Sequence, residues 1–228
     1  MEISTGDPDT FTAASAAYQR CVEWLASNHI VYGLPAAPQA CNEEQRELVI
    51  EAMGGAEEPP VFAPPADRVL GKLTFELDAA AAPRTVENIR ALCTGERGHA
   101  KSVRTAALHY KGCKFHRVLD DLIQGGDVTR GDGSGGESIY GSPIKTEAKA
   151  LQKKHSKPGT LGMASNGRTS TSQFYITLRA TPDLDGKQMV LGYAVDGDAV
   201  LAGIQAELDA ARAASRSPWI EVSDCGQV

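Results

Sequence analysis

What this 228-residue chain lacks narrows its class before any motif is considered. It has no apolar run approaching the ~18 residues that a membrane span needs, so we expect no membrane partner. Its five cysteines are scattered, odd in number and without a Cys-x-x-Cys pair, which favours reduced thiols and argues against a zinc site. The acidic start, Met1 to Asp7, lacks the basic residues of a secretory signal. We therefore expect a cytoplasmic protein, with a nuclear or assembly-bound location as the alternative.

Positive charge is scarce in the first part of the chain. The net charge of the whole chain is −6; residues 1–66 carry ten acidic and two basic side chains, whereas residues 67–228 carry 19 acidic and 21 basic ones. The slight positive balance of the larger part is far from the footprint of a nucleic-acid-binding protein. The acidic first part is expected to lie on a basic surface of this chain or of a partner.

Two amphipathic helices are predicted in the acidic part. One covers residues 10–28, where a single apolar stripe runs from Phe11 to Leu25 and Asp9 or Thr10 can cap the start. The other runs from Asn42 to residue 53, with Gln45 placed for a reciprocal cap.

Two short helices bury too little apolar surface to stand alone. We therefore expect residues 1–55 to be an acidic helical extension that docks on the main domain or joins a protein assembly. Residues 56–66 hold four prolines and predict an extended linker. Residues 67–228 would then form the main domain.

The main domain is predicted to be mainly β. Period-2 alternation predicts strands over 73–77 and 173–178, and two apolar runs with a tight connection predict a strand pair within 115–127. Thr85 and Asp198 are expected to cap two helices. Many short strands, glycine turns and only two helices suit a closed antiparallel barrel.

The glycine-dense run from Gly131 to Gly136 allows several interpretations. A phosphate cradle is disfavoured because no helix pattern follows and no Lys-Ser/Thr pair stands behind it. A calcium loop lacks its bidentate glutamate. A loop that needs several positive φ angles is the better account. The histidines do not fall at metal-ligand spacings, so we expect no metal and no cofactor.

Several collinear motifs carry a family resemblance. Phe115-His116-Arg117, then Gln124-Gly125-Gly126-Asp127, then the run from Gly133 to Gly141, resemble the signature of the cyclophilins, and matching segments continue from about residue 61 to the C-terminus. The resemblance implies a closed eight-stranded antiparallel barrel capped by two helices. It also implies peptidyl-prolyl cis-trans isomerase activity on proline-containing peptides or proteins.

The resemblance assigns roles to nine residues. An Xaa–Pro bond rotates slowly because amide resonance imposes a barrier of ~18–20 kcal/mol, and a guanidinium that donates toward the prolyl nitrogen opposes that resonance. By resemblance Arg117 is this catalytic group and Gln124 orients it. The resemblance implies a substrate-binding set made of Leu122, Ala164, Ser165, Gln173, Tyr175, Leu184 and Gln188.

Departures from the family pattern predict a weak enzyme. Asp120-Asp121 replace a Pro-Gly-Phe element, which removes an aromatic ring from the proline pocket, and Asp183 stands where an aromatic residue or histidine would support a cyclosporin-type ligand. Each polar replacement in an apolar pocket costs ~1–3 kcal/mol. The alternative is a catalytically impaired module that binds proline-containing partners or belongs to a larger assembly. In a further alternative Arg117 pairs with Asp120 or Asp121 and never meets a substrate.

Two further expectations concern the edges of the domain. Residues 97–110 lengthen a loop as in the divergent-loop cyclophilins, some of which are proposed to use the positions of Cys93 and Cys225 as a redox pair.

The first barrel strand, at Val61-Phe62, is followed by Pro64-Pro65, where ladder donors are expected. We expect the two N-terminal helices to cover this weak edge, so that deleting residues 1–55 would lower the melting temperature.

Overall fold

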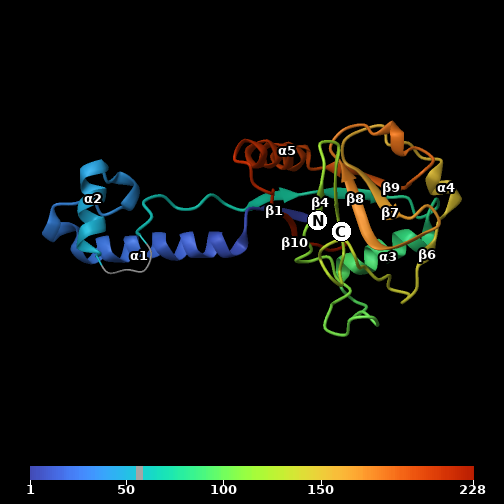
Figure 1. The fold of residues 1–228 in the computed structure, drawn as a ribbon, viewed down its shortest axis with the longest axis horizontal. Helices are drawn as coiled ribbons and strands as arrows, with labels where there is room; N and C mark the ends of the chain where they lie inside the picture. Colours follow the sequence, from blue (N-terminus) through green and yellow to red (C-terminus); the bar gives the residue numbers. More distant parts are fainter. Residues whose placement is uncertain (55–58) are drawn as a thin grey trace. The chain divides into compact units, whose positions relative to one another are not determined.

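The chain forms two compact units (Figure 1). The computed structural model describes residues 1–54 and 59–228. One unit is Gly6–Arg68, which we call the helical insertion; the other joins Met1–Thr5 to Val69–Val228 and is called the β unit. The helical insertion therefore interrupts the β unit in sequence, because five residues of the β unit precede it. Across the described ranges, no helix combines the length and apolar character needed to cross a bilayer.

The helical insertion contains α1 (Pro8–Tyr32), the short 3-10 helix η1 (Pro38–Ala40) and α2 (Glu43–Ala52). The cap of α1 is Asp7 rather than Asp9 or Thr10, because the Asp7 carboxylate accepts the backbone N–H of Asp9 at 3.1 Å. The reciprocal cap predicted between Asn42 and Gln45 is confirmed, with hydrogen bonds of 2.9 and 3.0 Å.

The apolar stripes of α1 and α2 meet in a small core of their own. Its buried members are Cys21, Leu25, Leu34, Cys41 and Val49, with Trp24, Met53 and Phe62 packed around them. Phe62 belongs to this cluster and lies 5.5 Å from the Arg46 guanidinium, so the prediction of a barrel strand at Val61-Phe62 is wrong. Gly55 and the first part of the expected linker, residues 56–58, lie outside the described residues.

The β unit contains two antiparallel sheets. The three-stranded sheet has the order β10-β1-β2, from Ile220–Asp224, Glu2–Thr5 and Val69–Lys72. The larger sheet has the order β3-β9-β7-β8-β5-β4, from Thr74–Leu77, Met189–Asp196, Thr160–Ser165, Thr169–Thr177, Leu122–Gly125 and Arg117–Val118, and β6 (Ile144–Lys145) also pairs with β8. The mainly β, antiparallel class is confirmed, whereas closure into one eight-stranded barrel stays a prediction.

Strand β1 lies in the middle of the three-stranded sheet and has no counterpart in the sequence analysis. Ile3 pairs with Val222 of β10 on one side and with Gly71 of β2 on the other, and its side chain is fully buried. Residues 2–5 are therefore part of the β unit, although they precede the helical insertion in the chain.

Helices α3 (Pro83–Thr94) and α5 (Asp198–Ala213) supply apolar side chains to the core of the β unit, and α4 (Ala148–Leu151) and η2 (Pro182–Leu184) are short. Gly95 ends α3 with φ 68°. The predicted caps of α3 and α5 are wrong. Thr85 lies within the first turn of α3 and donates its hydroxyl to Glu147 at 2.6 Å, and Gly197, not Asp198, precedes α5 as its N-cap.

Candidate functional site

A single row of cross-strand partners brings the principal predicted residues together. Arg117 on β4 pairs with Gln124 on β5, Gln124 pairs with Tyr175 on β8, and Tyr175 pairs with Gly162 on β7. Residues directly opposite each other on neighbouring strands project from the same face. Arg117, Gln124 and Tyr175 therefore share one face of the larger sheet, although up to 58 positions separate them in the numbering.

The Arg117 side chain is exposed, and within residues 1–54 and 59–228 its guanidinium makes no hydrogen bond or ion pair. Asp120 forms its ion pair with Arg212 of α5, and the carbonyl of Asp121 accepts the N–H of Leu178 at 2.8 Å. The alternative in which an adjacent acid neutralises Arg117 is thus wrong for this structure. The guanidinium keeps its donors for a ligand.

Gln124 is held in one orientation by Gln173. The Gln173 Nε2 donates to the carbonyl oxygens of Gly133 and Gly135, both at 2.8 Å. Carbonyl oxygens only accept, so the Gln173 amide nitrogen must face them and its Oε1 must face away. That Oε1 accepts from Gln124 Nε2 at 2.9 Å, which leaves Gln124 Oε1 as an acceptor.

The glycine-rich loop that receives Gln173 is organised by Asp127. The buried Asp127 carboxylate accepts the backbone N–H groups of Thr129, Arg130, Gly133 and Gly135 at 2.9–3.2 Å. Burial opposes ionisation, but these hydrogen bonds outweigh it and hold the pKa of Asp127 below its usual value.

Positive φ angles within this loop confirm the interpretation made from the sequence. The φ values are 76° at Gly131, 90° at Gly133 and 104° at Gly136. Because the chain's own amides surround Asp127, the carboxylate is used to fold the loop. In the part of the chain that the structure describes, histidine, cysteine and carboxylate side chains do not gather in threes around a point that a metal ion could fill.

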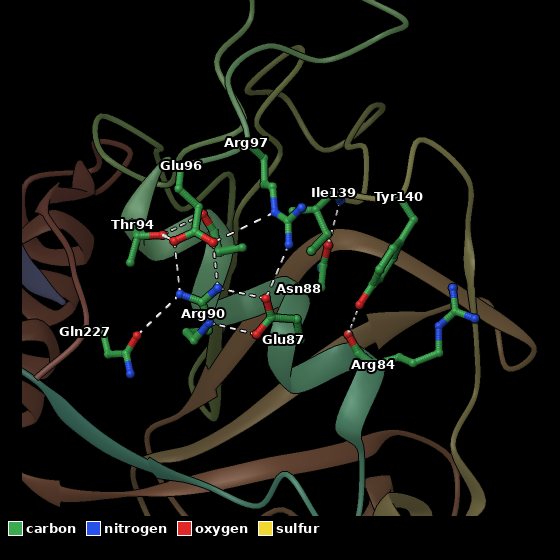
Figure 2. A network of polar contacts seen from close by, with 11 residues as sticks. Arg84, Glu87, Asn88, Arg90, Thr94, Glu96, Arg97, Ile139, Tyr140 and Gln227 are labelled. Carbon is green, nitrogen blue, oxygen red and sulfur yellow. Dashed lines mark hydrogen bonds and ion pairs between the residues drawn. The ribbon is translucent and has the colours of Figure 1, made fainter.

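Helix α3 anchors the same region, a feature that the sequence analysis missed. Figure 2 shows Asn88 of α3, whose Oδ1 accepts the N–H of Ile139 at 2.8 Å. Its Nδ2 donates to the carbonyl of Thr171 at 2.9 Å, two residues before Gln173. One amide therefore joins the segment after the glycine-rich loop to β8.

A second group of polar contacts in Figure 2 surrounds Arg90, near the end of α3. Arg90 binds Glu87 at 2.7 Å and Glu96 at 2.6 Å, and it also donates to the side-chain oxygen of Gln227 at 3.3 Å. The hydrogen bonds from Arg90 and Thr94 lower the pKa of Glu96 to about 2. Since these groups are partly exposed, the network positions the loop more than it stabilises the fold.

Tyr175 is almost fully buried, at 3% exposure. Its ring lies against the backbone of Gly162, where an added methyl carbon would overlap the ring carbon Cζ and the hydroxyl oxygen. The hydroxyl lies 2.6 Å from Nε2 of His155, and the two rings stack with centroids 5.9 Å apart. The tyrosine therefore has a fixed place that only a glycine at position 162 permits.

Asp185 completes this arrangement. It accepts the backbone N–H of His155 at 2.8 Å and lies 2.9 Å from Nδ1, and these two hydrogen bonds lower the pKa of Asp185 to about 2. An ionised carboxylate only accepts, so Nδ1 of His155 carries a proton and donates to Asp185, while Nε2 shares a hydrogen bond with the Tyr175 hydroxyl. Burial raises the pKa of Tyr175, which keeps that hydroxyl protonated. Neither His155 nor Asp185 was identified from the sequence.

The expected apolar pocket offers little exposed surface. Leu122, on β5, is 8% exposed, and Tyr175 is covered as described; Leu184 is half-buried in η2, next to Asp185. A cavity of about 320 Å³ lies elsewhere in the β unit, with Phe75, Ile89 and Leu161 in its wall, and none of the predicted site residues lines it.

The residues expected to grip the peptide contact one another. Ser165 donates its backbone N–H and its hydroxyl to Oε1 of Gln188 at 3.2 and 3.0 Å, and Gln188 Nε2 donates to the Ser165 carbonyl at 3.3 Å. Ala164 precedes Ser165 on β7 and is half-buried.

The two cysteines suggested by the resemblance are also brought together. Cys93 and Cys225 line the 320 Å³ cavity as free thiols. A hydrogen bond between them raises the pKa of the buried Cys93 and lowers the pKa of Cys225. Their redox role stays a prediction.

These features define a mainly β protein in which the Arg117 guanidinium, without a hydrogen bond or ion pair to any described residue, lies beside two oriented carboxamides. Such a site is suited to holding a peptide through hydrogen bonds. The model of the cyclophilin type peptidyl-prolyl cis-trans isomerase/CLD family matches residues 66–227. The chain therefore belongs to the cyclophilin family, and the resemblance seen in the sequence is confirmed. Most of the helical insertion lies outside the match.

Proposed function

We propose that this protein is a weak peptidyl-prolyl cis-trans isomerase that acts on Xaa–Pro bonds of peptides and proteins, assisting folding or remodelling its clients. The observation that carries the proposal is the exposed guanidinium of Arg117 beside Gln124; this guanidinium has no hydrogen bond or ion pair within residues 1–54 and 59–228. Membership of the family supports the same activity.

The mechanism follows from what these two residues can donate and accept. Isomerisation forms and breaks no covalent bond, so a catalyst must favour the twisted amide over the planar one. Arg117 would donate toward the prolyl nitrogen, whose lone pair is released from resonance in the twisted state. Gln124 Oε1, fixed by Gln173 and the glycine-rich loop, would accept from the peptide and keep it in register with Arg117.

Low activity is proposed because the proline pocket is reduced. Tyr175 and Leu122 expose little apolar surface, and the Asp120-Asp121 segment lacks an aromatic side chain. A proline ring bound there would bury less area and bind more weakly. A cyclosporin-type ligand would be weakened further by the exposed Asp183.

We also propose that the two sheets close into the eight-stranded barrel expected of the family. The segment before β4 supports closure: Gly112 and Phe115 donate their N–H groups to Val222 and Ile220 of β10, at 2.7 and 2.9 Å. On the other side only Leu73 separates β2 from β3.

A second candidate function is a module that binds proline-containing partners without isomerising them. The buried Tyr175 and the contact between Ser165 and Gln188 favour it, since both occupy positions assigned to the substrate. The two candidates differ in whether Arg117 promotes rotation of the Xaa–Pro bond once the peptide is bound.

Protease-coupled isomerisation of a short Ala-Pro peptide separates them. We expect Arg117→Ala to lower kcat/KM about 100-fold, the scale of losing one oriented donor to a transition state. Arg104→Ala, which removes an exposed guanidinium from the loop over 97–110, is the matched control and should keep the wild-type rate. Equal rates for wild type and Arg117→Ala, both at the uncatalysed background, would leave only the binding module.

A further inference from the structure

Among the strands that the structure describes, none covers the backbone edge at the end of β7. Strand β9 begins at Met189, which pairs with Met163, so β7 runs two residues past it to Ser165. On its other side Ser165 is opposite Ser170 of β8. The N–H and C=O of one strand residue point to the same side of the strand. Both groups of Ser165 therefore point to the side of β7 on which β9 pairs with the earlier residues of the strand.

The side chain of Gln188 occupies this edge. Its Oε1 accepts the Ser165 N–H at 3.2 Å and its Nε2 donates to the Ser165 carbonyl at 3.3 Å. One carboxamide thus makes the pair of hydrogen bonds that a peptide group of an added strand would make. The Ser165 hydroxyl, at 3.0 Å from the same Oε1, adds a third contact.

We propose that Gln188 is a built-in competitor of the substrate backbone, which an extended peptide must displace from Ser165 before its proline can reach Arg117. This rests on the proposed peptide-binding function of the same site. Extended peptides add to exposed strand edges through main-chain hydrogen bonds, which makes them the ligand that this edge fits. Peptides that offer both an N–H and a C=O at this register displace Gln188 without leaving Ser165 unpaired. Gln188 therefore sets affinity and selects for an extended backbone, and contributes no binding contact of its own.

Gln188→Ala tests the proposal, because it empties the edge. We expect the dissociation constant of an Ala-Pro tetrapeptide, measured by NMR titration of the whole chain, to fall about tenfold, since the peptide no longer competes with two internal hydrogen bonds. Gln188→Asn is too short to span to Ser165 and should act alike. Gln205→Leu is the matched control, because Gln205, on α5 and away from the site, bonds to the exposed Asp209 four residues later on the same helix.

Hydrogen exchange at the Ser165 amide distinguishes competition from a structural role. In Gln188→Ala we expect this amide to exchange faster in the free protein and to become protected again when the peptide binds. Unchanged or weaker affinity in both Gln188 variants, with Arg117-dependent isomerisation intact, would overturn this inference alone. Tighter binding without isomerisation would sustain it while the isomerase proposal fails. No binding by wild type or by either variant would overturn both.

Discussion

Gly162 has no side chain, and this decides where the Tyr175 ring lies. In Gly162→Ala the new methyl group would overlap the Tyr175 ring, so the ring or the β7 backbone must shift. Overpacking of this kind costs ~1–3 kcal/mol, and we expect the free energy of unfolding measured in urea to fall by that amount.

Gly226→Ala is the control for this substitution, because a methyl group there meets nothing within 4 Å. In a double variant, Gly162→Ala with Tyr175→Ala, the loss should be smaller than the sum of the two single losses, since the overlap between the methyl group and the ring is gone. Equal stability of Gly162→Ala and the wild type would show that the ring is not confined.

Asp185 should contribute to stability in a defined pH range. Its pKa is lowered to about 2 in the folded chain, against 3.8 for an unperturbed aspartate. A lowered folded pKa stabilises the fold above the unfolded value, and that contribution disappears as the pH falls from 3.8 toward 2. Asp185→Asn should therefore be less stable than wild type at pH 6, with the difference shrinking as the pH approaches 2 in acid unfolding experiments. A difference that stays constant with pH would contradict this account.

Among single residues, the sequence predicted those that belong to a family motif. Arg117, Gln124 and Gln173 were identified in this way. In the structure Arg117 pairs with Gln124 across strands, and the Gln124 amide donates to Gln173. Asn88 and His155 were missed, because their partners lie 51 or more and 20 or more positions away and nothing local marks them. The role of a buried polar residue depends on contacts with distant parts of the chain, which form only when the chain folds.

The glycine-rich loop behaves as one element because a single carboxylate binds four of its amides. Asp127→Asn keeps the shape but replaces one acceptor oxygen by a donor, which would face the N–H groups of Gly133 and Gly135 or those of Thr129 and Arg130. We expect a loss of ~1–3 kcal/mol in unfolding free energy. Faster amide exchange should appear at Gly133 and Gly135.

Asp132→Asn provides the comparison within the same loop. Asp132 is exposed and accepts hydrogen bonds from the nearby Ser134, so its replacement should leave stability near the wild-type value. Similar losses in the two variants would mean that Asp127 has no special role in the loop.

Elements with a clear periodicity were predicted well, and short ones were not. The alternation over 73–77 and 173–178 matches β3 and the end of β8, and the two predicted amphipathic helices match α1 and α2. Strand β2, Val69–Lys72, shows no such alternation. Pairing with β10 on one side and with β2 on the other makes β1 a strand. Two helix caps differ from the predicted residues because more than one residue near each helix start can act as a cap. Asp7 lies near the predicted Asp9, and Gly197 lies next to the predicted Asp198.

At the scale of the whole molecule, the helical insertion should be removable. Its buried cluster contains no residue of the β-unit core, and Ser4 pairs with Val69, so the two strand ends lie side by side. Replacing residues 6–68 by an Asn-Gly turn should give a folded β unit whose melting temperature stays within a few degrees of wild type, measured by calorimetry.

Deleting residues 1–55 is the contrasting variant. It removes β1 as well as the helices, and with it the fully buried Ile3, so we expect a marked drop in melting temperature or failure to fold. A large drop in the variant that keeps β1 would show instead that the helices stabilise the β unit directly, as first expected from the sequence.

The chain position of β1 also has a kinetic consequence. Its two neighbours are residues 69–72, beyond the insertion, and residues 220–224, near the other end of the chain, so both of its ladders close very long loops. Such distant pairings slow folding because chain entropy is lost before the contacts form. Converting β1 and β2 into an ordinary tight hairpin would make one of these ladders local, and the refolding rate should rise even where the equilibrium stability hardly changes.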